Sequence, residues 1–325
     1  MIEKLNLSGP ADLLATIPHL LGITPKESFV VLTANAGALG ATLRVDAPEH
    51  VEPVNYAQTL TSHAANDDKA TASYLVVYTD ENQDSYPYAA HVAALVSELA
   101  AARMPVRNVW LVTSSYWTEF GTDEEHPLEQ ITDSHANATF TFFGSATDID
   151  VYNPALLGTW AMPVQAPEGN DADIEAACTA WAAVLDSTGT PDHDTARSIA
   201  GAFQHKMVRD FLFREIITTH NGNFADVILG TFTGRPDWTR VDRAQSIAFE
   251  LMKAVPAGQR APMLTLMGWL EWLKGNGTQA GRYLKHADTD APGFRLAGLL
   301  LELINRGSVA EVARDPETSY QRHNN

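Results

Sequence analysis

Two short, continuously apolar segments that flank an amphipathic helix constrain this chain most. Residues 74–78 (Y-L-V-V-Y) and 109–112 (V-W-L-V) have the length and continuity of strands buried on both faces. Between them, a helix ending near residue 103 is indicated by apolar residues at helical spacing, namely Tyr88, Val92, Leu95, Val96 and Leu99. A strand–helix–strand unit of this kind closes as a parallel crossover, so the sequence predicts an α/β sheet.

The segment before this unit predicts a helix followed by a β-hairpin. Apolar residues recur at helical spacing over residues 8–21 and end at Gly22, a common helix terminator. Residues 29–33 form an apolar run, and residues 35–37 (N-A-G) have turn chemistry. Residues 39–46 alternate with a period of two, so Thr42, Arg44 and Asp46 are expected on one face of the second strand.

The pattern weakens after residue 120. Residues 116–120 (Y-W-T-E-F) predict an antiparallel return strand, whereas polar and turn residues dominate positions 121–167. An aromatic island at 140–143 (F-T-F-F) is expected to be β-like, and residues 163–170 are expected to form a linker. The α/β domain is therefore predicted over residues 1–165.

The rest of the chain predicts an all-helical domain over residues 170–315, followed by a frayed tail over residues 316–325. Amphipathic stretches are expected to be helical over residues 174–185, 203–219, 244–254, 263–273, 279–286 and 295–304. The last helices begin at intervals that resemble the helix–turn–helix rhythm of tetratricopeptide repeats. The predicted fold is an α/β domain, with a mixed sheet and helices on its faces, followed by a helical bundle with tetratricopeptide-like helix pairs.

The charge balance and the cysteine content narrow the classes of function. The chain carries 22 Lys and Arg against 40 Asp and Glu, a formal net charge of −18. Because this charge repels phosphate backbones and anionic lipids, we expect neither nucleic acid nor a membrane as partner. Cys178 is the only cysteine, which excludes an intrachain disulfide and a cysteine-based metal cluster. The chain begins without the basic-then-apolar layout of a signal peptide, so a cytoplasmic location is expected.

Three blocks of sequence together resemble an actinobacterial and actinophage family described only as domain of unknown function 4192. The first block is P-A-D-L-L-A-T-I-P-H-L-L-G-I-T-P-K-E-S-F-V-V-L at 10–32, with T-L-R-V-D-A-P at 42–48. The second is V-W-L-V-T-S-S-Y-W-T at 109–118, and the third is P-M-L-T-L-M-G-W-L-E-W-L-K-G-N-G-T-Q-A-G-R-Y-L at 262–284, continuing to residue 307. The stretch 121–191 departs from the family pattern. The resemblance implies the architecture and supplies no activity, substrate or site residue.

The end of the first buried strand offers the first candidate ligand site. Asp80 and Asp84 follow that strand, and Ser114 follows the parallel strand. Ligands gather at the carboxyl ends of strands in open α/β sheets, and carboxylate oxygens are the ligands that Mg²⁺ prefers. The alternative interpretation is a solvated turn in which Asp84 or Ser85 caps the next helix.

A second candidate site combines polar and aromatic residues of two strands. Arg44 and Asp46 share a strand face, and Trp117 is expected on a neighbouring edge strand. Such a patch can recognise a small ligand or a peptide. The alternative interpretation is an Arg–Asp ion pair on a solvent-exposed face.

Other potential motifs have simpler structural explanations. His193–Asp194 is reminiscent of the metal-binding pair of phosphohydrolases, but Asp192 or Asp194 is better explained as a helix cap. The sequence contains no Gly-x-Ser-x-Gly elbow, no Walker loop and no His-Glu-x-x-His motif. We therefore assign no catalytic residue, no metal ligand and no cofactor.

The last long helix carries an apolar stripe wider than one neighbouring helix requires. Leu296, Leu299, Leu300 and Leu303 recur at helical spacing, and terminal helices of a repeat need a cover. This stripe predicts a protein partner or a homo-oligomer through the C-terminal helices. Three functions remain open: a non-catalytic interaction or regulatory protein, which the sequence favours; a Mg²⁺-dependent enzyme acting on a phosphate-bearing small molecule at the strand ends; and a structural oligomer subunit.

Overall fold

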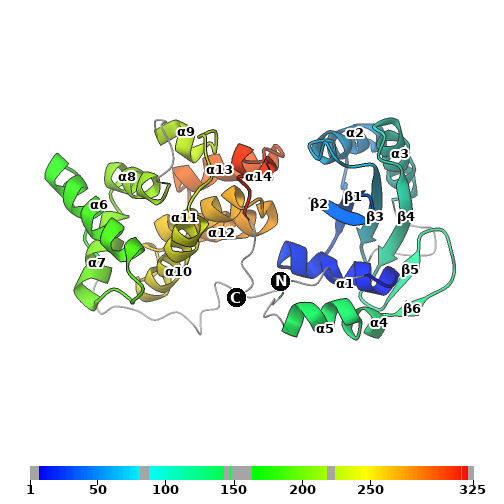
Figure 1. Cartoon of the computed structure of the whole chain (residues 1–325), viewed down its shortest axis with the longest axis horizontal. Helices are drawn as coiled ribbons and strands as arrows, with labels where there is room; N and C mark the ends of the chain where they lie inside the picture. The colour runs from blue at the N-terminus through cyan, green and yellow to red at the C-terminus, as the bar shows by residue number, and fades with distance from the viewer. Residues whose placement is uncertain are drawn as a thin grey trace. The chain divides into compact units, whose positions relative to one another are not determined.

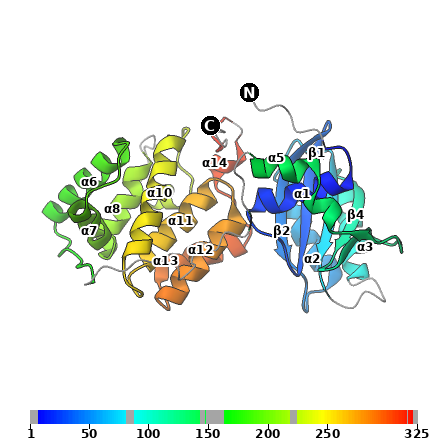
Figure 2. The same ribbon diagram turned by 90° about the horizontal axis from the view of Figure 1, so that it is seen from below.

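The chain divides into two compact units, residues 1–149 and residues 150–323 (Figures 1 and 2). The computed structural model describes residues 7–80, 88–142, 147, 163–217, 224–315 and 317–320. The first unit is an α/β unit and the second is helical, so the predicted fold class is confirmed.

The α/β unit is built on a mixed sheet with strand order β2-β1-β3-β4-β5-β6. Its strands are β1 (Ser28–Asn35), β2 (Ala38–Asp46), β3 (Ala72–Tyr78), β4 (Val106–Val112), β5 (Tyr116–Glu119) and β6 (His126–Pro127). Only β3 and β4, which flank α3 (Ala89–Ala101), pair in parallel; the other neighbours in this sheet are antiparallel. The parallel pair predicted from the two apolar runs is therefore present.

The hairpin between β1 and β2 closes through a two-residue turn. Ala36 and Gly37 both have positive φ, 47° and 84°, as mirror-image hairpin turns require. A register shift between Leu32 and Ala34 interrupts the ladder. Because of this irregularity, Leu39 packs on the opposite face of the sheet from Leu43, and the strict alternation expected over residues 39–46 does not hold.

Helices cover both faces of the sheet, as Figure 1 shows. One face packs against α2 (Pro53–Ala64) and α3, and its core includes Phe29, Leu75 and Leu95. The other face packs against α1 (Pro10–Leu21), α4 (Glu129–Thr132) and α5 (His135–Phe142). Alternating residues along each strand pack into the cores on opposite faces of the sheet. This explains why the predicted strands are continuously apolar.

The β-like island predicted at 140–143 is wrong for the residues that the structure describes, because 140–142 belong to helix α5. The Ser134 hydroxyl accepts a hydrogen bond from the Asn137 amide at 3.1 Å, as a helix cap does. Asp12 of α1 accepts a second one from the Ala136 amide at 3.0 Å. These two acceptors stabilise the first turn of α5 despite the aromatic, β-favouring composition of its end.

The helical unit contains α6 to α14 among the residues that the structure describes. They are α6 (Asp171–Asp186), α7 (His193–Ala202), α8 (Lys206–Ile216), α9 (Phe224–Ile228), α10 (Trp238–Ala254), α11 (Ala261–Leu273), α12 (Gly277–Asp290), α13 (Arg295–Asn305) and α14 (Glu311–Arg314). Helix α11 is central, packed by α10 and α12 and buried almost all round. Gly268 permits the close approach of α12, because a Cβ there would lie 2.8 Å from Leu284 Cγ.

Two expected boundaries of the helical domain are corrected. The predicted linker at 163–170 belongs to the helical unit, since Val164 is buried and exchanges two hydrogen bonds of 2.9 Å with the Gln259 side chain. Residues 317–320 are not frayed: the Trp238 indole donates to the Thr318 carbonyl at 2.9 Å, and the Tyr320 hydroxyl lies 3.0 Å from an Asp242 carboxylate oxygen.

Candidate functional site

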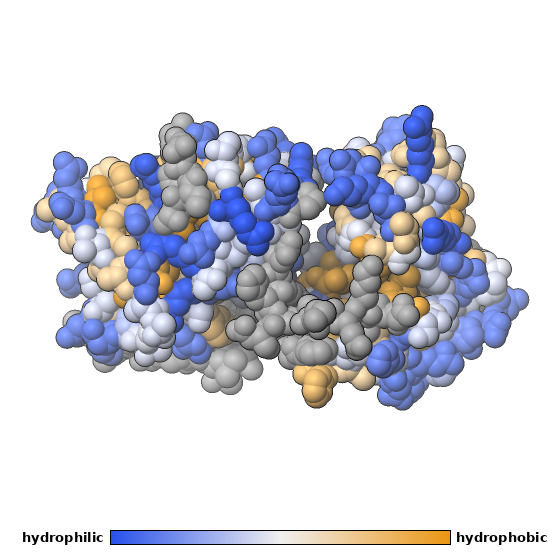
Figure 3. Space-filling model, in the orientation of Figure 1, coloured by the Kyte–Doolittle hydropathy of each residue, from blue (hydrophilic) through white to orange (hydrophobic). Residues whose placement is uncertain are grey.

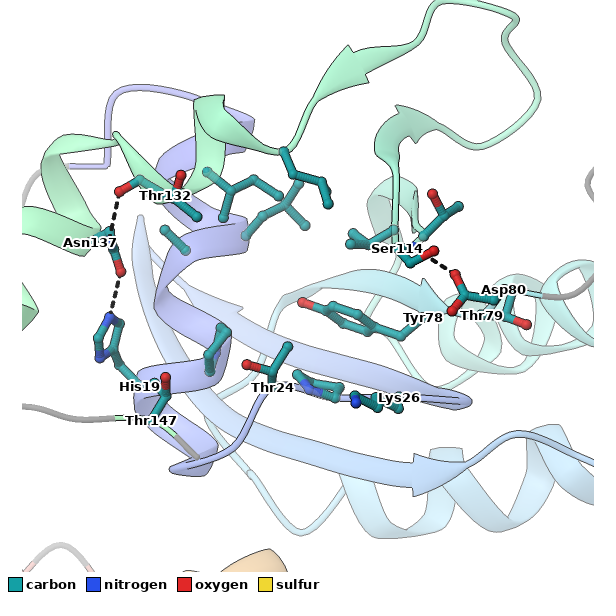
Figure 4. A pocket seen from close by; sticks show the side chains of 18 of the residues that line it. His19, Thr24, Lys26, Tyr78, Thr79, Asp80, Ser114, Thr132, Asn137 and Thr147 are labelled. Atoms are coloured by element: carbon teal, nitrogen blue, oxygen red, sulfur yellow. Dashed lines mark hydrogen bonds between the residues drawn. The ribbon is translucent and has the colours of Figure 1, made fainter. Parts of the chain in front are cut away.

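A cavity of about 410 Å³ lies at the carboxyl ends of β3 and β4, on the face of the sheet that α1 covers (Figure 4). Its walls are mainly apolar, formed by Leu14, Ala15 and Pro18 of α1, Val112 of β4, and Leu128 and Ile131 next to or in α4. Polar residues line the side where the two parallel strands end, and these are Glu27, Thr79, Asp80 and Ser114. The site therefore combines an apolar body with a short polar rim, the usual composition of a small-molecule site.

Hydrogen bonds fix the shape of this polar rim. The Glu27 carboxylate accepts from the Thr79 hydroxyl at 2.7 Å and from the Asp80 amide at 2.8 Å. Asp80 Oδ1 in turn accepts from the Ser114 amide at 2.6 Å, which joins the end of β3 to the end of β4. Glu27 adopts a φ of 38°, a conformation that non-glycine residues rarely hold and that concentrates at functional sites.

Thr113 positions Ser114 by forming the turn between β4 and β5. Its hydroxyl oxygen accepts from the amides of Ser115 and Tyr116, at 3.1 and 3.0 Å. A threonine that satisfies the next backbone donors in this way stops the strand and reverses the chain. Ser114 is thereby held at the strand end with its amide directed at Asp80.

Tyr78, the last residue of β3, projects into the cavity from the sheet (Figure 4). The alternation along β3 places it on the α1 face together with Val76, and its side chain is buried. Burial raises the pKa of Tyr78 above its ordinary value, so the phenol stays neutral and retains its proton.

The far side of the cavity is held by a polar bridge between α1 and α5. The ring Nε2 of His19 lies 2.8 Å from Asn137 Oδ1, and the side-chain amide of Asn137 donates from Nδ2 to the Thr132 carbonyl at 2.7 Å. The His19 ring also stacks on Phe140 with ring centres 4.9 Å apart. This bridge fixes α5 to α1 and thereby completes the wall of the cavity.

The structure brings together part of the first predicted site. Asp80 and Ser114 meet at the cavity, whereas Asp84 lies outside the described residues. Among the described residues, no group of three His, Cys, Asp or Glu side chains is arranged to hold a metal ion. Three residues of this site, Glu27, Tyr78 and His19, were not predicted from the sequence, and no local pattern distinguishes Tyr78 from Tyr74 of the same strand.

The second predicted site is not a single patch. Arg44 and Asp46 lie on β2 at one edge of the sheet, and three strands separate them from Trp117 on β5. Arg44 forms an ion pair of 2.5 Å with Asp46, in agreement with the structural alternative. Trp117 is buried and stacks on His126 with ring centres 4.2 Å apart. The expectation that the two strands are neighbours is wrong, because the β1–β2 hairpin places β2 at the edge of the sheet opposite to β5 and β6.

The His193–Asp194 segment begins helix α7. The carboxylate of Asp192 accepts from the Thr195 amide at 2.9 Å, so Asp192 is the cap. The Thr195 hydroxyl donates a second hydrogen bond to this carboxylate at 2.9 Å. The hydrogen bond from the amide, and after it the one from the hydroxyl, lower the pKa of Asp192.

The apolar stripe of α13 divides between core and surface. Leu300 belongs to the core, whereas Leu299 is 52 % exposed and Leu296 and Leu303 are half-buried. Apolar side chains also gather over α6 and α8 in the view of Figure 3, where Met207 of α8 is 47 % exposed. Leu300 is thus removed from the predicted partner surface, and Leu299 is its most exposed member.

No helix in the described part of the chain has both the length and the apolar character needed to span a bilayer.

Comparison with known proteins identifies a family and no individual relative. No curated protein and no solved structure matches the chain significantly. The family described as "Domain of unknown function (DUF4192)" matches residues 10–151 and 159–310, and this match includes most of the stretch 121–191, which was expected to depart from the family pattern. The chain therefore belongs to the DUF4192 family.

Proposed function

We propose that this protein is a non-catalytic regulatory protein whose α/β unit binds a small molecule in the cavity at the ends of β3 and β4. The single observation that carries the proposal is the cavity itself, with apolar walls and a hydrogen-bonded polar rim. The carboxyl ends of parallel strands are the general ligand site of open α/β sheets, and the volume lies within the range of ligand pockets.

The surroundings of the cavity support a regulatory role. A bound molecule would contact α1, the α4 region and both parallel strands at once. Binding to the folded state alone stabilises it by about 2.7 kcal/mol when the ligand concentration is one hundred times Kd. Occupancy would therefore strengthen the packing of several elements together, which is the property that a ligand-controlled protein needs.

Thermal unfolding with a metabolite panel tests this proposal. We expect at least one compound to raise the Tm of the native chain, and Ala15→Trp to abolish that rise by filling the cavity from α1. Leu20→Trp is the matched control, because Leu20 lies on the same helix, is exposed and does not line the cavity. A Tm rise that persists in Ala15→Trp would place the binding site elsewhere.

The same panel separates binding from the enzymatic alternative, a Mg²⁺-dependent enzyme acting on a phosphate-bearing small molecule. Asp80 and Glu27 are the rim residues whose carboxylate oxygens suit Mg²⁺. If phosphate esters raise the Tm only with Mg²⁺ present, and are then consumed on incubation, the enzyme is favoured. Stabilisation without Mg²⁺ and without turnover supports the regulatory protein.

We also propose that the helical unit forms a homodimer through α13, centred on Leu299. The supporting observation is that this large apolar side chain is 52 % exposed on a helix whose other stripe leucines are buried or half-buried. Light scattering is expected to give twice the chain mass for the native protein and the monomer mass for Leu299→Glu. Met207→Glu, on the exposed face of α8, is expected to remain dimeric. A monomeric native protein would refute the homodimer and leave a different protein partner as the use of this surface.

We also propose an actinobacterial or actinophage source and a cytoplasmic location for the protein. The three sequence blocks favour an actinobacterial or actinophage source, and the acidic composition with one cysteine favours the cytoplasm. Fractionation of a host that expresses the chain would test the location.

A further inference from the structure

One hydroxyl that faces the cavity, that of Tyr78, has no hydrogen-bond partner in the described part of the chain. The Tyr78 side chain is only 6 % exposed and projects into the cavity (Figure 4). Among the residues that the structure describes, none forms a hydrogen bond with its hydroxyl group. The mainly apolar walls of the cavity supply no acceptor for this hydroxyl, so a hydrogen bond to it has to come from a molecule inside the cavity. A ligand that supplies an acceptor would satisfy this donor.

The neighbouring rim residue offers a complementary acceptor. Asp80 Oδ1 is occupied by the Ser114 amide at 2.6 Å. Its second oxygen, Oδ2, receives no hydrogen bond from any described residue. A carboxylate oxygen accepts hydrogen bonds and donates none, so this position selects an O–H or N–H group.

The charges around the cavity oppose an anionic ligand. Three lining side chains carry a formal charge: Lys26, Glu27 and Asp80. Two are negative, and they are adjacent, since the Glu27 carboxylate accepts the Asp80 amide at 2.8 Å. A second anion placed against Asp80 Oδ2 would be repelled and would leave both groups without a donor.

We infer that the ligand is an uncharged or cationic molecule with a compact apolar ring, a hydrogen-bond acceptor for Tyr78 and an O–H or N–H donor for Asp80. Carboxylates and phosphate esters of similar shape are rejected. The inference rests on the proposed function and specifies the chemistry of its ligand. Tyr78 and Asp80 are the residues that determine this specificity.

Matched pairs of probes that differ only in charge test the inference. Nicotinamide is compared with nicotinate and adenosine with adenosine monophosphate, and each compound that raises the Tm in the metabolite panel is compared with its nearest carboxylated, phosphorylated or uncharged analogue. Calorimetry gives Kd, and the backbone amide resonances of Asp80 and Ser114 report binding at the cavity. We expect the uncharged or cationic member of each binding pair to bind at least tenfold more tightly, a difference that one charged or hydrogen-bonding group supplies.

Two conservative substitutions attribute the selectivity to its residues. Tyr78→Phe removes only the hydroxyl and is expected to weaken the uncharged ligand about tenfold. Asp80→Asn keeps an acceptor for the Ser114 amide, converts the other side to a donor and is expected to abolish the discrimination against anions. Tyr74→Phe and Asp133→Asn are the controls: Tyr74 lies on the same face of β3 but outside the cavity, and Asp133 is an exposed carboxylate outside the lining.

The outcomes separate this inference from the proposed function. Binding of the anionic member as tightly as its partner, or unchanged affinity in Tyr78→Phe, overturns the inference and leaves a small-molecule site in place. Failure of every probe and panel compound to perturb Asp80 and Ser114 overturns the proposed function and the inference together.

Discussion

Replacing Leu300 with glutamate is expected to unfold the helical unit. Leu300 is 3 % exposed in the core between α13 and its neighbours. The substitution removes a buried aliphatic side chain, which costs about 2–5 kcal/mol, and introduces a carboxylate without a partner. Their sum approaches the whole stability of a typical domain, about 5–15 kcal/mol. Circular dichroism should show loss of helix at room temperature or a large fall in the Tm.

The adjacent residue provides the matched control for that experiment. Leu299→Glu changes the same residue type on the same helix, but at a side chain that is 52 % exposed. Surface substitutions usually change the free energy of unfolding by within about 0.5 kcal/mol, so Leu299→Glu is expected to fold normally. Equal effects of the two substitutions would contradict the assignment of Leu300 to the core and Leu299 to the surface.

Asp12→Ala is expected to destabilise the α/β unit by about 2 kcal/mol, because it leaves two backbone donors without an acceptor. Asp12 accepts from the Ser8 amide at 2.8 Å and from the Ala136 amide at 3.0 Å, and so joins the start of α1 to the start of α5. Both helices border the cavity. Urea unfolding followed through amide signals of β3 and α1 measures the effect.

The same residue gives this stability a pH dependence. Burial alone would raise the pKa of Asp12, but the hydrogen bonds from Ser8 and Ala136 outweigh it and hold the pKa below the ordinary 3.8. A pKa depressed by folding contributes stability that is fully present above the unfolded value and is lost as the pH falls through the folded one. The stability difference between native protein and Asp12→Asn should therefore shrink below about pH 4.

Asp133→Asn is the control for both measurements, since Asp133 is exposed next to α5. It should change neither the stability nor its pH dependence. A difference between the native protein and Asp12→Asn that stays constant from neutral to acid pH would show that the charge of Asp12 contributes nothing.

The elements predicted correctly are those with strong local periodicity. The apolar runs 74–78 and 109–112, with the amphipathic stretch between them, were sufficient to predict β3, β4 and α3 and the parallel pairing of the two strands. In the helical unit, apolar spacing over 263–273 and 295–304 predicted α11 and α13 to within two residues at each end. In these segments, propensity and burial favour the same structure.

The errors arose where contacts between distant residues decide the structure. The end of α5 has strand propensity, but Asp12, more than one hundred residues earlier, accepts a hydrogen bond from its first turn. Residues 163–170 have the composition of a linker, yet Gln259 holds Val164 on the helical unit. Strand order was likewise beyond the local pattern, so Arg44 and Trp117 were wrongly expected on neighbouring strands.

In the candidate site, the residues at the ends of the parallel strands were predicted, whereas those that distant contacts bring to the cavity were not. Asp80 and Ser114 follow parallel strands, and the general rule for strand ends was enough to bring them together. Glu27 precedes an antiparallel strand and reaches the rim only through its hydrogen bonds to Thr79 and Asp80. Tyr78 looked like a strand core residue, and only the cavity beside its ring distinguishes it.

Crystals of the native chain soaked with a charge-balanced fragment library would test most directly whether this cavity is a ligand site. Fragments are expected to bind between α1 and the ends of β3 and β4, within hydrogen-bond distance of the Tyr78 hydroxyl or Asp80. The same soaks of Ala15→Trp crystals should leave that position empty. Fragments that bind the α/β unit only elsewhere, or that occupy this position unchanged in Ala15→Trp, would contradict the assignment of this cavity as a ligand site.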